Sequence, residues 1–138
     1  MVNVLITGGA GYLGSTLSQY LLDRGYFVDV MDNLMYEQTS LLHLCHNEYF
    51  TIIKHDVTDF HALENIIPNY DVIIPLAAIV GAPSCNKNKS LSKLVNYDAH
   101  KNIIAQSSRD AGIKKSIKKD LKISDLTAIS EIDDDFER

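Results

Sequence analysis

Three glycines near the N-terminus, in the stretch TGGAGYLG, constrain the fold more than any other feature of this chain. Gly8, Gly11 and Gly14 are spaced three residues apart, between an apolar run at residues 2–7 and an amphipathic stretch at residues 11–24. The apolar run is typical of a buried strand, and the amphipathic stretch predicts a helix. The positions expected on the buried face of that helix are Leu13, Leu17, Tyr20 and Leu21. A glycine-rich turn is therefore expected to join a strand directly to a helix.

The same alternation of strand and helix continues along the chain. Further strands are predicted at residues 26–31, 50–54 and 71–76, and helices at residues 36–44, 59–66 and 90–111. Pro75 fits only the end of its strand, because proline cannot donate a ladder hydrogen bond. Strands that alternate with helices in this order must be parallel and joined by right-handed crossovers. The expected fold class is therefore α/β, a doubly wound parallel sheet of the Rossmann type.

Length, charge and cysteine content narrow the class of protein. The chain has 138 residues, which predicts one domain, and no apolar run approaches the roughly 18 residues of a membrane span. A net charge of −5 argues against a nucleic-acid partner. Cys45 and Cys85 lie far apart and form no metal or disulfide pattern. Two isolated thiols favour the reducing cytoplasm, so we expect a cytoplasmic protein without a nucleic-acid or membrane partner.

The position of the glycines between strand and helix predicts a dinucleotide cradle. Gly8 would permit the tight turn, Gly11 would let the backbone approach a pyrophosphate, and Gly14 would let helix and strand pack closely. The helix N-terminus would present unpaired N–H groups and a partial positive charge to the phosphates.

Asp32 follows the second predicted strand, 18 residues after Gly14. An acidic side chain at this place is expected to bind the ribose hydroxyls of the adenosine. The 2′-phosphate of NADP would meet this carboxylate at contact distance, which costs up to about 4 kcal/mol per charge pair. Because no arginine is close in the sequence to compensate, NAD is the expected cofactor.

The combined motifs resemble those of the extended short-chain dehydrogenase/reductases, the NAD-dependent epimerase/dehydratase family that acts on nucleotide sugars. TGGAGYLG matches the TGxxGxxG pattern of this family, and DNL at residues 32–34 is similar to its ribose- and adenine-contacting turn. HDVTD at residues 55–59 resembles its adenine-side segment, and PLAAIVG at residues 75–81 resembles the segment that lines the cofactor, with Pro75 in place of the usual histidine. The helix VNYDAHKNII carries Asn96 where the family typically has asparagine.

The resemblance covers about residues 1–115 and implies a set of cofactor-binding positions. These are Gly8, Gly11, Tyr12, Leu13, Gly14, Asp32, Asn33, Leu34, Asp56, Val57, Leu76, Ala77 and Ala78.

The same resemblance implies that the catalytic residues of the family are missing here. In the family, a fifth strand and a Tyr-x-x-x-Lys pair follow the segment that AGIKK matches, whereas this chain continues as SIKKDLKIS. Tyr97 and Lys101 form the one such pair, but they lie one helix too early for a catalytic role. One further group of reactive side chains consists of His43, Cys45 and His46. No second pair of metal ligands follows at a suitable spacing, so we expect no metal there.

Residues 1–115 are therefore interpreted as an NAD-binding Rossmann domain that stops after its fourth strand, and residues 116–138 as a charged tail. The tail is expected to be helical, although Ile117, Leu121 and Ile123 also permit an edge strand. The predicted function is that of the NAD(P)-binding domain of a nucleotide-sugar epimerase or dehydratase, without independent catalysis.

Two alternatives stay open: a free-standing NAD-binding regulatory module, and an interaction protein that pairs through the open edge of its fourth strand. The expected partners are a dinucleotide, a nucleotide sugar only if the missing half is supplied, and a second copy at that edge.

Overall fold

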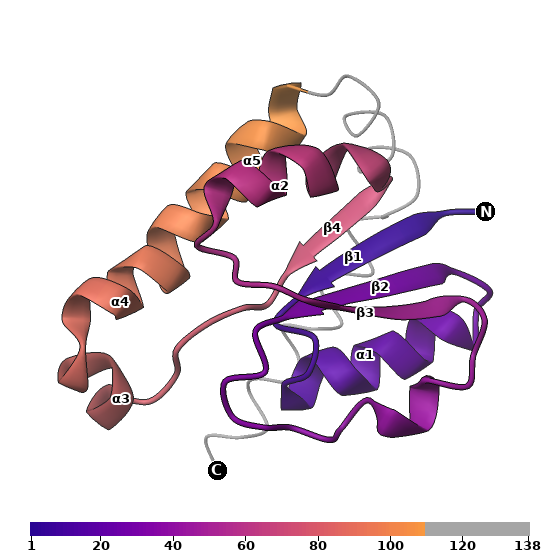
Figure 1. Cartoon of the computed structure of the whole chain (residues 1–138), viewed down its shortest axis with the longest axis horizontal. Helices are drawn as coiled ribbons and strands as arrows, with labels where there is room; N and C mark the ends of the chain where they lie inside the picture. The colour runs from indigo at the N-terminus through magenta and orange to yellow at the C-terminus, as the bar shows by residue number, and fades with distance from the viewer. Residues whose placement is uncertain (110–138) are drawn as a thin grey trace, which may run out of the picture.

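The computed structural model describes residues 1–109 and contains one parallel sheet. Its strands are β1 (Asn3–Thr7), β2 (Phe27–Asp32), β3 (Phe50–Lys54) and β4 (Val72–Pro75). They lie in the order β3-β2-β1-β4, and each neighbouring pair is parallel (Figure 1). The prediction of a doubly wound parallel sheet is confirmed, and Pro75 ends its strand opposite Thr7, as expected.

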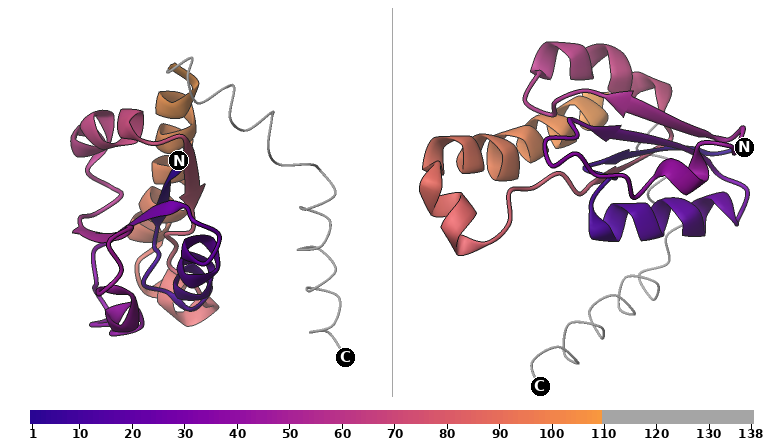
Figure 2. Two further views of the ribbon diagram at one scale, coloured as in Figure 1. Left: turned by 90° about the vertical axis from the view of Figure 1, so that its right-hand side faces the viewer. Right: turned by 60° about the horizontal axis from the view of Figure 1, so that its bottom comes forward.

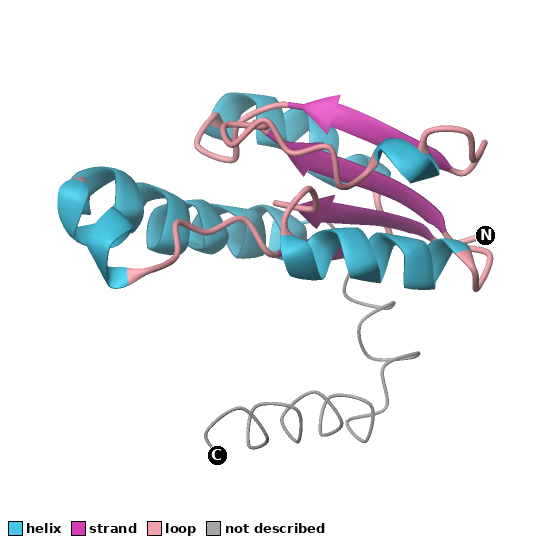
Figure 3. Ribbon diagram, turned by 90° about the horizontal axis from the view of Figure 1, so that it is seen from below, coloured by secondary structure: helices cyan, strands magenta, loops and turns pink. Residues whose placement is uncertain are grey.

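Helices cover both faces of this sheet. The helical elements are α1 (Tyr12–Leu22), η1 (Leu42–Leu44), α2 (Phe60–Ile66), η2 (Ile67–Asn69), α3 (Ala82–Lys87), α4 (Lys89–Lys93), η3 (Leu94–Ala99) and α5 (His100–Arg109). Figure 2 shows α1 on one side of the strands and α2 on the other, and Figure 3 shows α1 running alongside the sheet. Right-handed crossovers between parallel strands produce this two-sided cover.

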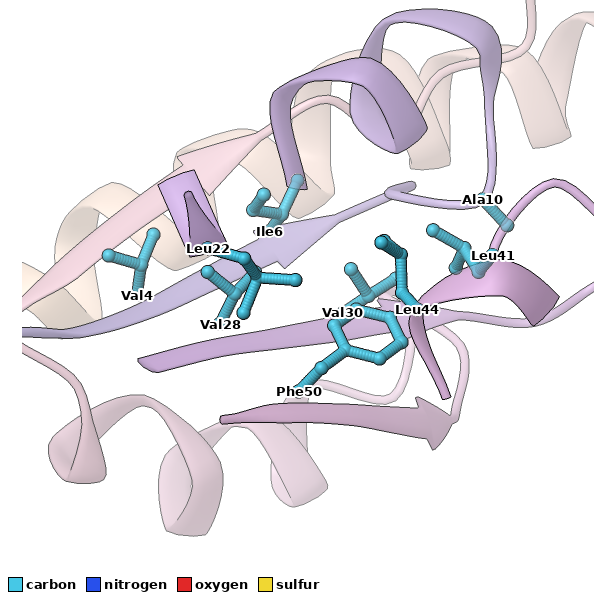
Figure 4. Close-up of a cluster of buried hydrophobic side chains, with 9 residues drawn as sticks. All are labelled: Val4, Ile6, Ala10, Leu22, Val28, Val30, Leu41, Leu44 and Phe50. Carbon is cyan, nitrogen blue, oxygen red and sulfur yellow. The ribbon is translucent and has the colours of Figure 1, made fainter. Parts of the chain in front are cut away.

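Two hydrophobic clusters fill the space between the sheet and the helices. Along β1, Val4 and Ile6 face α1, whereas Leu5 faces the opposite side, because successive side chains of a strand alternate. The cluster on the α1 side is drawn in Figure 4 and consists of Val4, Ile6, Ala10, Leu22, Val28, Val30, Leu41, Leu44 and Phe50. The cluster on the other side joins the sheet to α2 and α5: Leu5, Met31, Val57, Leu63, Ile67, Ala99 and Ile103.

The buried face of α1 differs from the predicted one. Leu17 and Leu21 pack against the core as expected, but Leu13 and Tyr20 are 61% and 51% exposed. The buried row is instead Gly14, Ser18 and Leu22. Small side chains let the helix axis approach the strands closely, and the Ser18 hydroxyl is satisfied by donating to the Gly14 carbonyl at 2.7 Å. The apolar spacing therefore predicted a buried face centred on Leu17 and Leu21, whereas the residues buried most deeply are the adjacent row of Gly14, Ser18 and Leu22.

The predicted helix at residues 36–44 is wrong. The structure has turns and irregular backbone there, followed by the single 3₁₀ turn η1. Leu34 and Glu37 both lie in the left-handed region, with φ of 55° and 51°, which is incompatible with the start of an α-helix. Leu41 and Leu44 still reach the core, so the apolar spacing in this stretch reflects burial of a loop.

The long helix predicted at residues 90–111 is present from Lys89 to the end of the described chain, interrupted by the π-helical η3. Its N-terminus is capped by Asn88, whose side chain accepts a hydrogen bond from the Leu91 N–H at 3.0 Å. The predictions for the tail at residues 116–138 lie outside the described residues. Within residues 1–109, no helix has the length and apolarity needed to cross a membrane.

Candidate functional site

A cavity of about 570 Å³ opens at the carboxyl ends of the strands. Its walls come from the glycine turn after β1, from the ends of β2 and β3, and from the segment after β4. Ligands of doubly wound sheets bind at this edge, where the strand order reverses, which here is between β1 and β4. The lining residues are Gly8, Gly11, Tyr12, Leu13, Gly14, Met31, Asp32, Asn33, Met35, Tyr36, Gln38, His55, Asp56, Val57, Leu76, Ala77, Ala78, Ile79, Val80, Leu91 and Val95.

The glycine turn is shaped by steric exclusion at two positions. Gly8 has a φ of +70°, and a Cβ placed on it would lie 2.5 Å from the backbone of Ala77. A Cβ on Gly14 would lie 2.4 Å from the Cα of Gly9, so no side chain fits between α1 and the turn. Gly11 is different, because its Cβ would approach only the Gly8 carbonyl oxygen, at 3.3 Å. The turn is therefore closed to any side chain at Gly8 and Gly14, whereas a Cβ at Gly11 would make a single tight contact with a backbone carbonyl.

The N-terminus of α1 points its free backbone groups at this cavity. The helix begins at Tyr12 after Gly11, which has no side chain to cap it, and Tyr12, Leu13 and Gly14 line the cavity. The first N–H groups of a helix have no partner within the helix, and the macrodipole gives that end a partial positive charge. This arrangement can bind an anionic group such as a pyrophosphate.

Asp32 ends β2 at the cavity and is 8% exposed. Its carboxylate accepts hydrogen bonds from the Ala10 N–H at 3.0 Å and from the Leu34 N–H at 2.9 Å. These two bonds fix the orientation of the carboxylate between the glycine turn and the loop after β2. Each oxygen retains acceptor capacity, which the paired hydroxyls of a ribose can use.

Asp56 and Asn33 form a polar pair beside Asp32. The Asn33 amide donates to Asp56 at 3.0 Å, and Thr58 donates to the same carboxylate from its N–H at 2.9 Å and its hydroxyl at 2.7 Å. Burial alone would raise the pKa of Asp56, but these hydrogen bonds and the nearby His55 hold that pKa below its ordinary value of 3.8. This end of the cavity is thus rich in oriented acceptors.

The described cavity-lining side chains include neither arginine nor lysine. Arg24, the arginine nearest to Asp32 in the sequence, stacks on the ring of Tyr20 near the far end of α1, 3.3 Å from its centroid. The charged side chains near the Asp32 end of the cavity are therefore the carboxylates of Asp32 and Asp56, with the imidazole of His55 beside them.

The wall on the β4 side is a segment that lies beyond the sheet. Leu76, Ala77 and Ala78 line the cavity, followed by Ile79 and Val80. Asn96 holds this segment, because its side chain accepts from the Ile79 N–H at 2.7 Å and donates to the Ile79 carbonyl at 2.8 Å. A single amide side chain thus imitates the pairing of a neighbouring strand.

Twelve of the thirteen predicted binding residues line this cavity. The exception is Leu34, whose side chain packs against the core cluster on the α1 side. Sequence reasoning missed Gly9, whose Cβ would clash with Val30 at 2.6 Å, and nine lining residues that were not among the thirteen predicted positions, although His55, Ile79, Val80 and Val95 fall within the quoted family motifs. These nine are Met31, Met35, Tyr36, Gln38, His55, Ile79, Val80, Leu91 and Val95.

The Tyr-x-x-x-Lys pair lies outside the cavity. Tyr97 is 58% exposed, and the Lys101 amine is 6.0 Å from the centroid of its ring. Neither residue lines the cavity.

The sequence of this chain matches a known protein family. The sequence profile described as the NAD dependent epimerase/dehydratase family matches residues 4–118. UDP-N-acetyl-alpha-D-glucosaminuronate decarboxylase from Bacillus cytotoxicus is 35% identical over 101 residues, which cover 72% of this chain and 31% of that protein.

Solved structures agree with this match. UDP-N-acetylglucosamine 4-epimerase from Methanobrevibacter ruminantium is 30% identical with a TM-score of 0.71, over 79% of this chain and 34% of that one. UDP-glucuronic acid 4-epimerase from Bacillus cereus, solved with UDP-glucuronic acid and NAD, is 26% identical with a TM-score of 0.69, over 76% and 36%. The chain spans about a third of the length of these relatives. By its sequence match and its fold, this chain belongs to the NAD-dependent epimerase/dehydratase family.

Proposed function

We propose that this chain provides the NAD-binding part of a nucleotide-sugar epimerase or dehydratase, and that its 138 residues do not catalyse turnover by themselves. The family is NAD-dependent, and its member from Bacillus cereus was solved with NAD. The relatives named above act on UDP-linked sugars, which supports a nucleotide sugar as the substrate class.

The observation that carries this proposal is the shape of the glycine turn at the cavity. Neighbouring backbone excludes a side chain at Gly8 and Gly14, and a Cβ on Gly11 would already lie 3.3 Å from the Gly8 carbonyl oxygen. A turn without side chains lets a pyrophosphate approach the unpaired N–H groups at the α1 N-terminus. The residues of this chain therefore fit a dinucleotide.

Each part of the cavity has a role in this proposal. Asp32 accepts hydrogen bonds from the ribose hydroxyls of the adenosine, and Asn33 and Asp56 surround the adenine side. The N-terminus of α1 binds the pyrophosphate. A bound NAD would supply the acceptor for a hydride from a carbon of the sugar. The acid–base group that such a step needs is not supplied by Tyr97, because Tyr97 does not line the cavity.

Titration with NAD and NADP tests the proposal directly. At a ligand concentration 100 times the dissociation constant, binding adds about 2.7 kcal/mol to the free energy of unfolding, which a thermal shift detects. We expect a shift with NAD and a much smaller one with NADP, because a 2′-phosphate would face the Asp32 carboxylate. A cooperative melt that neither dinucleotide moves would contradict the proposal.

Gly11→Ala is the matched control for this titration. Its backbone, with φ of −70° and ψ of 175°, suits any residue, and the added methyl group would approach only the Gly8 carbonyl. The variant is expected to be destabilised much less than Gly14→Ala, because the Gly8 carbonyl need shift by only a few tenths of an ångström, and to lose the NAD shift. Loss of folding in this variant would mean that Gly11 serves the fold and not the ligand.

One further partner is proposed from the sheet edge. Within residues 1–109, β4 pairs only with β1, and all four of its residues are half-buried. An unpaired strand edge can accept a strand from another chain, so a second copy is the proposed partner there. Size-exclusion chromatography that shows only monomer would contradict this.

Cys45 and Cys85 are free thiols, which supports the reducing cytoplasm as the proposed location.

A further inference from the structure

The segment after β4 is held in place by side chains, because the sheet no longer holds it. The last ladder contact of this strand is the Leu76 N–H, which donates to the Thr7 carbonyl at 2.9 Å. Beyond it the chain runs alongside the α4–α5 helix before it reaches α3 (Figures 1 and 3). Ala77 also forms the floor of the glycine turn, since it lies where a Cβ of Gly8 would be. The position of this segment therefore sets one wall of the cavity.

Two side chains of the helix hold alternate residues of the segment. Asn96 pairs with both backbone groups of Ile79, and His100 Nε2 lies 2.9 Å from the Ala77 carbonyl oxygen. A carbonyl only accepts, so Nε2 must carry the proton and donate. The Asn96 and His100 side chains thus hold two residues of the segment that are two apart, Ile79 and Ala77.

The helix that carries His100 is itself anchored in the core. Its neighbours Ala99 and Ile103 are 0% and 2% exposed and belong to the cluster that contains Leu5 and Met31. His100 is half-buried beside them. Its hydrogen bond therefore ties the cavity wall to a fixed part of the molecule.

The order of the strands decides which half of a dinucleotide meets this wall. Asp32, Asn33 and Asp56 lie at the ends of β2 and β3, on one side of the glycine turn, and β4 lies on the other side of β1. If the adenosine binds at Asp32, the second nucleoside extends along residues 77–80. Resting on the function proposed above, we propose that His100 is a positioning residue for the second nucleoside of NAD, acting through the Ala77 carbonyl.

Two substitutions of similar size separate this role from packing. His100→Met keeps the bulk but removes the donor, whereas His100→Gln keeps both the bulk and an N–H donor. Calorimetric titration of the 138-residue chain compares NAD with ADP, which lacks the second nucleoside. We expect His100→Met to weaken NAD binding about tenfold, the typical effect of one lost hydrogen bond, and to change ADP binding less than twofold. His100→Gln is expected to restore most of the NAD affinity.

Each other result of these titrations contradicts the inference in a distinct way. Equal losses of NAD and ADP affinity in His100→Met would show a general effect on the fold, and unchanged NAD affinity would show that the hydrogen bond positions nothing. A wild-type chain that binds neither ligand would overturn the proposed function itself, and with it this role.

A spectroscopic measurement on the wild-type chain needs no variant to fold. Long-range ¹H–¹⁵N correlation at neutral pH should show the neutral His100 ring as the Nε2–H tautomer, because Nε2 faces the Ala77 carbonyl. The Nδ1–H tautomer would overturn the inference.

Discussion

Gly11 and Gly14 are both glycines of the TGGAGYLG motif, but a Cβ added at each position would contact different atoms at different distances. At Gly14 the first carbon of any side chain would lie 2.4 Å from the Gly9 Cα, and the contacting atoms are backbone atoms that cannot rotate away. Gly14→Ala should therefore lower the free energy of unfolding by about 3 kcal/mol, as overpacking does, measured by urea denaturation. Gly11→Ala is the comparison, and equal stability of the two variants would contradict this account of α1 packing.

A single acidic residue, Asp32, can both bind a ligand and fix the backbone around the cavity. The Asp32 carboxylate accepts N–H groups from Ala10 and Leu34, so the glycine turn and the loop after β2 are both fixed relative to it. The Leu34 N–H reaches Asp32 while Leu34 adopts its left-handed φ of 55°. The backbone strain at Leu34 is thus coupled to the orientation of the proposed ribose-binding group.

Among the elements, the loop between β2 and β3 stores strain that can be removed. Glu37 has a φ of 51° and an exposed side chain, and its N–H donates to the Leu34 carbonyl at 2.9 Å. Glycine adopts this conformation without steric cost, so Glu37→Gly should raise the free energy of unfolding by about 0.5 to 1 kcal/mol.

The control for this substitution is a glutamate in a helix. Glu64 lies in α2 with a side chain that is 56% exposed, and Glu64→Gly should lower the free energy of unfolding by about 1 kcal/mol. Urea denaturation of both variants measures the two effects. A Glu37→Gly variant that is destabilised as much as Glu64→Gly would show that the loop carries no removable strain.

The four strands were predictable because each is a short run rich in apolar and β-branched residues, and β1, at the centre of the sheet, is buried between two layers of helices. The buried face of α1 was not, because close packing selected Gly14 and Ser18 and left Leu13 exposed. Neither was the loop before β3, since the burial of Leu44 depends on contacts with distant strands.

The predictable part of the cavity was the part that local motifs describe. Gly8 and Asp32 stand at fixed offsets from strand ends, so spacing alone placed them at the same edge of the sheet. The hydrogen bonds of Asn96 and His100 depend on how a helix with a π-helical turn aligns with a segment 17 to 23 residues away in the sequence. No local pattern determines that alignment.

At the scale of the whole molecule, one hydrogen bond joins the end of the crossover from β3 to β4 to the centre of the sheet. Tyr70 lies between η2 and β4, and its hydroxyl donates to Asp29 in β2 at 2.6 Å. Burial and the bond to Asp29 raise the pKa of Tyr70 above its ordinary value of 10.0. Folding therefore favours the protonated phenol over the phenolate.

The pH dependence of stability follows from this raised pKa. A group that holds its proton more tightly when folded contributes its full stabilisation below its unfolded pKa, here 10.0, and loses it as the pH rises toward the folded value. At pH 7 the free energy of unfolding of the wild-type chain should be about 1 kcal/mol higher than that of Tyr70→Phe, a value that allows for the partial exposure of Tyr70 to solvent. Urea denaturation between pH 7 and pH 11 should show this difference shrinking above pH 10.0. Tyr97→Phe, which alters a tyrosine that is 58% exposed, is the matched control. A Tyr70→Phe difference that stays constant across this range would show that folding does not raise the pKa of Tyr70.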